Sequence, residues 1–126
     1  MAPLIPTAKG VSILVDSGAN VDSRPSFLVQ WAKMGSIYME NIMGIKNPKV
    51  AIVNVGLEEE KGNQLVKETY PLLKACKDIN FIGSIEARNI PNGDADVIVC
   101  DAFVGNVILK LYEGTAKMLL SKVRPH

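Results

Sequence analysis

The chain has 126 residues and a nearly balanced charge, with 14 lysines and arginines against 13 aspartates and glutamates. Nucleic-acid binding requires a clustered basic excess, and a membrane-spanning helix requires an apolar run of roughly 20 residues, so the sequence predicts neither a nucleic-acid partner nor a membrane span. Apolar residues make up 48% of the chain, which is enough for the core of one domain or a large part of one.

The only histidine is the last residue, His126. This position argues against Ser–His pairs, Cys–His pairs and a zinc site, because each needs an imidazole held within folded structure. Cys76 and Cys100 lack metal or redox spacing, so we expect reduced, buried thiols in a cytosolic protein. Neither G-x-G-x-x-G nor a Walker-type motif is present, and we predict no cofactor and no metal. Any chemistry in this segment must use carboxylates, lysines, amides and backbone N–H groups.

The chain is expected to begin with an entering loop over residues 1–9, which hold two prolines and little periodicity. The β-branched run over residues 11–15 is typical of a strand that is buried on both faces. A loop of small and polar residues, 16–20, follows this strand.

A helix is predicted next, with Pro25 in its first turn, Asp22 or Ser23 near its cap and Gly44 just past its end. Two neighbouring apolar stripes run along it at helical spacing. One stripe contains Phe27, Trp31, Met34, Tyr38 and Ile42, and we predict that its residues Trp31, Met34 and Tyr38 lie in the core. The other stripe contains Leu28, Ala32, Gly35 and Met39.

Residues 50–55 form the second predicted buried strand. The acidic run at 58–60 is interpreted as complementing the dipole of the helix that follows and extends to Cys76. Pro71 lies inside that helix and is expected to kink it or divide it near Tyr70, because proline removes a backbone donor.

A short third strand over residues 79–82 is expected to end at Gly83, and a fourth strand follows at 96–101. The link between them is too short for a crossover helix, so one strand pair is expected to break the parallel pattern. The last helix is predicted to start within 103–106 and to be largely buried outside its polar stripe, which contains Lys110, Glu113, Lys117 and Ser121.

Strands alternate with helices along the chain, which predicts an α/β fold: a mostly parallel sheet with helices on both faces. Ligands of such sheets bind beyond the carboxyl ends of the strands. All four ends carry glycine together with an amide or carboxylate, which predicts a site there, although turns also need glycine and asparagine for steric reasons alone. The residues at these ends are Asp16, Gly18 and Asn20; Asn54, Gly56, Lys61, Gly62 and Asn63; Gly83 and Glu86; and Asp101, Gly105 and Asn106.

The start of the last helix has two interpretations. As a phosphate site, it would use the free N–H groups of the helix, with Gly105 allowing close approach and Asn106 and Lys110 supplying a donor and a charge. As a simple cap, it would use only the Asp101 carboxylate. That carboxylate opposes an anion unless it is turned away, protonated or paired with a lysine such as Lys61.

Several segments together, in order and with matching spacing, resemble the phosphate acyltransferases of bacterial phospholipid synthesis, the PlsX family. They are Asp16–Asn20, Gly44–Pro48, Glu59–Asn63, Asn80–Gly83 and Asp96–Asn106. Three positions depart from the family pattern: Ala102 replaces the usual glycine, Ser84 an asparagine and Asn89 an aspartate.

The resemblance implies transfer of a fatty acyl group from acyl carrier protein to inorganic phosphate, which yields an acyl phosphate. It also implies a fold similar to phosphotransacetylases and to isocitrate and isopropylmalate dehydrogenases, in a cytoplasmic homodimer peripherally associated with the inner membrane face. Family members are longer, so residues 1–126 are expected to be one inactive segment of a larger acyltransferase domain. The candidate catalytic residues are Asn20, Lys61, Asn63, Asp101 and Asn106, and the candidate phosphate-binding residues are Gly18, Gly62, Glu86, Gly105 and Lys110.

Two alternatives stay open. One is a phosphotransacetylase-like enzyme that uses coenzyme A, which carrier dependence would separate from the leading hypothesis. The other is a catalytically inert module that only packs or dimerises, which an assay of the isolated chain would reveal.

Overall fold

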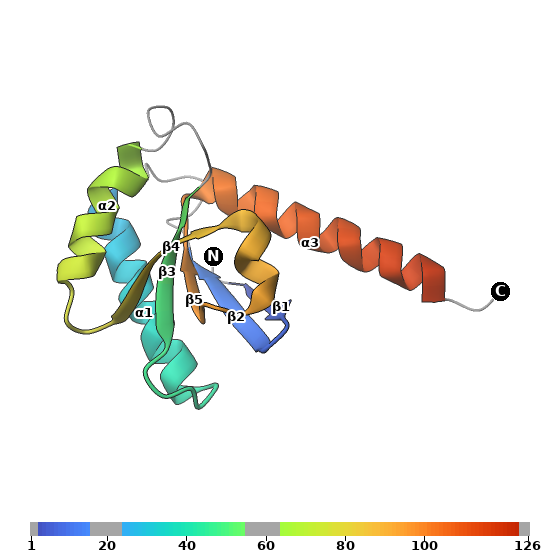
Figure 1. The fold of residues 1–126 in the computed structure, drawn as a ribbon, viewed down its shortest axis with the longest axis horizontal. Helices are drawn as coiled ribbons and strands as arrows, with labels where there is room; N and C mark the ends of the chain where they lie inside the picture. Colours follow the sequence, from blue (N-terminus) through green and yellow to red (C-terminus); the bar gives the residue numbers. More distant parts are fainter. Residues whose placement is uncertain (1–2, 16–23, 55–63, 124–126) are drawn as a thin grey trace.

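The computed structural model describes residues 3–15, 24–54 and 64–123 (Figure 1). These residues form one sheet with helices on both faces, which confirms the predicted α/β class. The elements in chain order are β1 (Leu4–Thr7), β2 (Gly10–Val15), α1 (Pro25–Asn41), β3 (Lys49–Asn54), α2 (Gln64–Ala75), β4 (Asn80–Glu86), the 3-10 helix η1 (Ala87–Asn92), β5 (Val97–Val99) and α3 (Ala102–Val123).

The five-stranded sheet has the order β1-β2-β5-β3-β4. β2, β5, β3 and β4 are mutually parallel, and only β1 runs antiparallel to its neighbour. The predicted break in the parallel pattern was therefore misplaced. The short β4–β5 link still makes a parallel crossover, through η1, and the antiparallel pair is β1–β2 instead.

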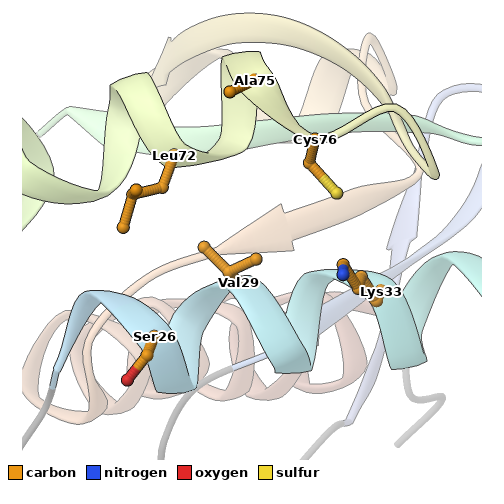
Figure 2. Close-up of a pocket in the computed structure, with 6 residues that line it drawn as sticks. All are labelled: Ser26, Val29, Lys33, Leu72, Ala75 and Cys76. Carbon is orange, nitrogen blue, oxygen red and sulfur yellow. The ribbon is translucent and has the colours of Figure 1, made fainter.

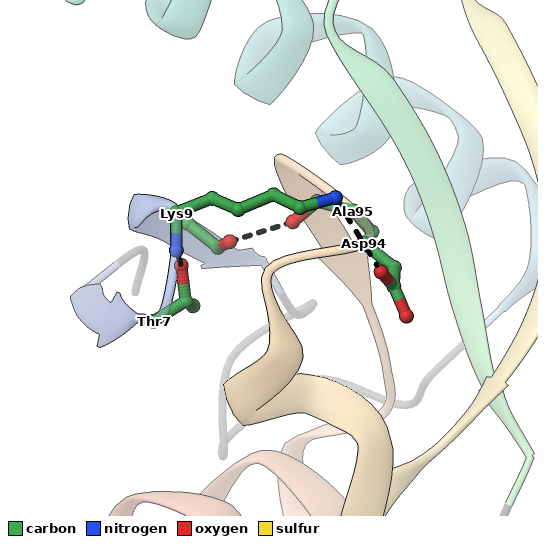
Figure 3. A network of polar contacts seen from close by, with 5 residues as sticks. Thr7, Lys9, Asp94 and Ala95 are labelled. Carbon is green, nitrogen blue, oxygen red and sulfur yellow. Dashed lines mark hydrogen bonds and ion pairs between the residues drawn. The ribbon is translucent and has the colours of Figure 1, made fainter.

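β1 corrects the prediction of an entering loop over residues 1–9. It pairs with β2 through a tight turn in which Gly10 has a φ of 131°. Pro6 is tolerated because β1 is an edge strand and needs backbone donors on one side only. The hairpin is tied to the segment before β5 by the Ser12 hydroxyl, which donates to the Ala95 carbonyl at 2.6 Å, and by a Lys9–Asp94 ion pair at 3.7 Å (Figure 3).

The central strands are buried on both faces, as their β-branched runs predicted, and they separate two core clusters. One cluster packs α1 and α2 against the sheet through residues such as Leu28, Leu73 and Val97. The other packs η1 and α3 against the opposite face, through residues such as Ile90 and Ile108. Figure 1 shows these two layers, with α3 extending well beyond the sheet.

The ends of α1 differ in part from the prediction. Pro25 does occupy the first turn, but the residue at the N-cap is Arg24, which makes no side-chain cap hydrogen bond. The predicted caps, Asp22 and Ser23, lie outside the described residues. The helix ends at Asn41, before Gly44, and Gly44 then turns the chain in a left-handed conformation with a φ of 70°.

The prediction that Trp31, Met34 and Tyr38 of α1 lie in the core is right only for Trp31, which packs against the core cluster, whereas Met34 and Tyr38 are exposed. The residues that face the sheet are Leu28, Ala32, Gly35, Ser36 and Met39, so the second apolar stripe is the core stripe. Met34 and Ile42 of the other stripe are 57% and 65% exposed. The small side chains explain why this stripe faces the sheet, because a helix approaches a sheet closely where alanine, glycine and serine face it.

Three later elements also correct the sequence-based expectations. The predicted division of α2 near Tyr70 does not occur, because Gln64–Ala75 is one helix that includes Pro71. β4 continues past Gly83 to Glu86, since Gly83, with a φ of 108°, lies at a shift in the β3–β4 register. On α3, Val107 and Leu111 are 44% and 63% exposed, so the apolar part of this helix is less buried than expected.

Gly35 generates a stability prediction. A Cβ at this position would lie 2.9 Å from Val97 Cγ1 and 3.1 Å from Val15 Cγ1, both on fully buried side chains. We expect Gly35→Ala to lower the free energy of unfolding by about 1–2 kcal/mol, because overpacking outweighs the gain in helix propensity. The control is Gly114→Ala on α3, where a Cβ would meet nothing within 4 Å. It should raise stability by about 0.5–1 kcal/mol. Urea denaturation measures both changes, and equal effects would contradict the proposed close approach.

Tyr112 generates a pH-dependent prediction. Its hydroxyl is buried on α3 with no hydrogen-bond partner among the described residues, and burial raises the pKa of the phenol. The folded state therefore keeps this proton to higher pH than the unfolded state, and stability falls as pH rises above about 10. Tyr112→Phe should raise stability by about 1 kcal/mol at neutral pH and make its alkaline decline shallower. The control is Tyr38→Phe, at an exposed position. Denaturation at pH 8 and above pH 10 gives the free energy of unfolding at each pH. An equal loss of this free energy in Tyr112→Phe and in the parent would refute the prediction.

Candidate functional site

The carboxyl ends of the four parallel strands lie along one edge of the sheet, as the sequence predicted. β2 ends at Val15 beside Val99 of β5, and β3 ends at Asn54 beside Glu86 of β4. Asn54 is half-buried at this edge. The loop or helix that follows each strand therefore starts from a common edge, which is where ligands of open α/β sheets bind.

Asp101 caps α3. Its Oδ1 accepts a hydrogen bond from the Val104 N–H at 2.7 Å, and its carbonyl accepts the Gly105 N–H at 2.9 Å. The half-buried carboxylate thus satisfies a backbone donor that the helix itself leaves without a partner. Its negative charge also stands where a phosphate at this helix start would have to bind. This contact favours the capping interpretation of Asp101, and the phosphate interpretation stays a prediction.

Three further predicted residues follow Asp101 on α3. Asn106 and Lys110 are exposed and lie one helical turn apart, so an amide donor and a cation are available to a ligand on the same side of the helix. Gly105 is buried. An anion could therefore use the side chains of Asn106 and Lys110 without entering the core.

An additional cation, Arg88 of η1, follows the end of β4. Glu86 Oε2 accepts from Arg88 Nε at 2.8 Å, and both side chains are well exposed. The sequence-based site included Glu86 but not Arg88. The i,i+2 spacing of opposite charges was the available signal, and a guanidinium suits phosphate because its N–H groups match the geometry of two oxygens.

Seven residues of the predicted site lie outside the described residues: Asp16, Gly18, Asn20, Gly56, Lys61, Gly62 and Asn63. A pairing of Lys61 with Asp101 therefore stays a prediction. No cluster of His, Cys, Asp and Glu capable of holding a metal ion occurs among the residues that were described. Within the same ranges, no helix combines the length and apolar character needed to cross a membrane.

Two surface cavities lie away from the predicted site residues. A cavity of about 340 Å³ lies between α1 and α2 and is lined by residues such as Val29, Leu72 and Cys76 (Figure 2). A second, of about 360 Å³, lies beside the β1–β2 turn, where Thr7, Lys9 and Asp96 line it. Neither cavity is lined by a predicted catalytic or phosphate-binding residue.

Comparison with known proteins gives consistent matches over the chain. A family model described as fatty acid synthesis protein matches residues 1–125. A phosphate acyltransferase from Clostridium perfringens strain SM101 is 56% identical over 124 residues, and one from Alkaliphilus oremlandii is 58% identical over 126 residues. A phosphate acyltransferase from Clostridium botulinum strain Loch Maree is 52% identical over 124 residues. Each match covers 98% of this chain but only 37% of the relative.

Replacement of Asp101 tests its role as a cap. Asp101→Ala should lower the free energy of unfolding by about 1 kcal/mol, because the Val104 N–H loses its acceptor. Asp101→Asn keeps a capping oxygen but removes the charge, so it should cost only a few tenths of a kcal/mol. Thermal and urea denaturation give both values. If Asp101→Ala proved neutral, the carboxylate would be free for another role.

Proposed function

Because the chain belongs to the fatty acid synthesis protein family, we propose that its full-length protein transfers a fatty acyl group from acyl carrier protein to inorganic phosphate. The product is an acyl phosphate for fatty acid and phospholipid synthesis. The observation that carries this proposal is the 56–58% identity, over 98% of the chain, to proteins named phosphate acyltransferase. The chain spans 37% of their length, so the activity is proposed for the longer protein.

The reaction suits the groups that this segment offers. A phosphate oxygen attacks the thioester carbonyl carbon, the new C–O bond forms, the C–S bond breaks, and the carrier thiol leaves with the sulfur electron pair and a proton. Phosphate is itself the nucleophile, and the thioester is already activated. Catalysis can therefore rest on positioning the two substrates and stabilising the oxyanion, which needs amides, cations and backbone N–H groups.

We assign phosphate binding to the carboxyl-terminal ends of the parallel strands. Asn106 and Lys110 are exposed on one side of α3, and Arg88, which follows the end of β4, supplies a second cation. The further donors in this proposal are Gly18, Asn20, Lys61, Gly62 and Asn63, in the two segments outside the described residues, with Gly105 at the helix start. Glu86 acts by holding Arg88, and Asp101 by holding the helix start.

The partners that follow from this function are acyl carrier protein thioester, inorganic phosphate and a second copy of the full-length enzyme. A long acyl chain partitions into a bilayer, so peripheral association with the inner membrane face fits a cytoplasmic enzyme of this kind. Nucleic acid is not among the proposed partners, because the formal net charge of the chain is only +1.

Measurement of acyl phosphate tests the proposal directly. The purified full-length protein is incubated with phosphate and either acyl carrier protein thioester or acyl coenzyme A. Formation of acyl phosphate that depends on the carrier-protein thioester supports the proposed substrate. Preference for the coenzyme A thioester would instead support a phosphotransacetylase-like enzyme, and no product from either would contradict the acyltransferase proposal.

Asn106 provides the sharpest test of the site. In the full-length enzyme, Asn106→Ala should raise the KM for phosphate or lower kcat by about three- to tenfold, because one hydrogen bond to the anion is lost. The matched control is Thr115→Ala, which removes an uncharged, exposed side chain on the opposite side of α3 from Asn106 and should leave phosphate dependence unchanged. Melting temperatures of both variants show whether the fold survives. Unchanged phosphate kinetics in a stable Asn106→Ala enzyme would remove Asn106 from the site.

A further inference from the structure

Helix α1 carries an apolar surface that is not used in the described fold. Met34, Ile37 and Ile42 are 57%, 59% and 65% exposed, and Tyr38 is 39% exposed. Single exposed apolar residues are ordinary on a protein surface, but a stripe along one helix marks an interaction surface. We call Met34, Tyr38 and Ile42 the outer stripe of α1.

The outer stripe lies on the side of α1 opposite α2. Val29 and Lys33 of α1 face α2 across the cavity between the two helices (Figure 2). Because successive residues of a helix are turned by about 100°, Met34 and Ile42 point about 100° and 180° away from Lys33. The sheet takes the direction of Leu28 and Ala32. The outer stripe therefore points sideways along the sheet, away from α2 and toward β1.

Among the described residues, the two helices on this face of the sheet pack mainly over β2, β5, β3 and β4. α2 contacts β3 and β4, whereas α1 contacts β2 and β5 and also reaches β3. Packed helices lie about 8–10 Å apart and neighbouring strands about 4.8 Å apart, so one helix covers about two strands. Leu4 of β1 pairs with Ile13, which belongs to the core cluster under α1, and Leu4 is 43% exposed. No helix of the described residues fills the position bounded by Leu4 and the outer stripe.

We propose that an amphipathic helix from the rest of the full-length polypeptide packs into this position, against the outer stripe and Leu4. The chain spans only 37% of its curated relatives, so most of their length is available to supply such a helix. Its apolar residues would recur at intervals of three and four, like those of α1. A second copy of this surface fits less well, because its own α1 is backed by its own sheet and cannot also cover β1 of the first copy. This inference is independent of the reaction.

Thiol accessibility in the full-length protein tests the proposal. Met34→Cys and Ile42→Cys place thiols in the outer stripe, and Glu40→Cys places one at an exposed position elsewhere on α1. Maleimide labelling is followed peptide by peptide, so the native Cys76 and Cys100 do not interfere. Rates measured in denaturant give the reference for each thiol. We expect the native fold to slow labelling at positions 34 and 42 more than tenfold relative to position 40.

Other outcomes overturn the proposal. Labelling at positions 34 and 42 as fast as at position 40 would show that the stripe is open to solvent. Protection that disappears when the protein is diluted to monomers would assign the stripe to a second copy. Hydroxyl-radical oxidation of Met34 and Tyr38 in the unmodified protein provides the same comparison without substitutions, and strong oxidation of both would also contradict a docked helix.

Discussion

The fold depends on how Asp96 joins three strands at the start of β5. Its N–H donates to the Lys49 carbonyl at 2.8 Å, its own carbonyl accepts the Ile13 N–H at 2.9 Å, and its carboxylate accepts the Lys49 N–H at 2.8 Å. β5 itself is only three residues long, yet it separates β2 from β3. These contacts fix the insertion of a short strand between two longer ones. At its other end, the Cys100 N–H donates to the Val15 carbonyl at 3.1 Å, and Asp101 follows at once. The register set at Asp96 therefore positions the cap of α3.

The sequence predicts the central strands well, but it predicts the edge strands β1 and β4 poorly, and both outcomes have physical reasons. Continuous β-branched runs occur only where both faces of a strand are buried, so β2, β3 and β5 were recognisable. β1 was missed because four residues with a proline resemble a loop, whereas an edge strand needs hydrogen bonds on one side only. The predicted β4 was too short because glycine commonly ends a strand, whereas Gly83 lies at a register shift within this one.

The buried face of α1 shows a different limit. Two apolar stripes have the same helical period, and hydrophobicity alone favoured the stripe with the larger side chains. The sheet instead meets the stripe with Ala32 and Gly35, because small residues allow the helix backbone to come close. The large residues of the outer stripe therefore remain exposed in the described fold. Residue size carried information here that periodicity did not, and it bears on where the remaining polypeptide packs.

The candidate site was predictable in its location but not in its contacts. Parallel pairing places the strand ends together, which the alternation of strands and helices already implied. The ion pair of Arg88 with Glu86 depends on where β4 ends, and the sequence-based boundary was four residues too early. The capping contact of Asp101 was one of two open interpretations, because the free N–H groups at a helix start can donate to either a side-chain cap or a bound anion.

α3 is long enough that a small change of direction at its start would move its far end by several ångströms. The helix has 22 residues, from Ala102 to Val123, and its first turns pack on the sheet, with Ile108 in the core. At 1.5 Å per residue it is about 33 Å long, so a tilt of about 10° at its start moves its far end by about 6 Å. The hydrogen bond of Asp101 to Val104 sits at the pivot of this lever. A ligand that displaced Asp101 from that N–H group and tilted the helix would therefore move the far end of α3, and whatever it contacts, much further than its start.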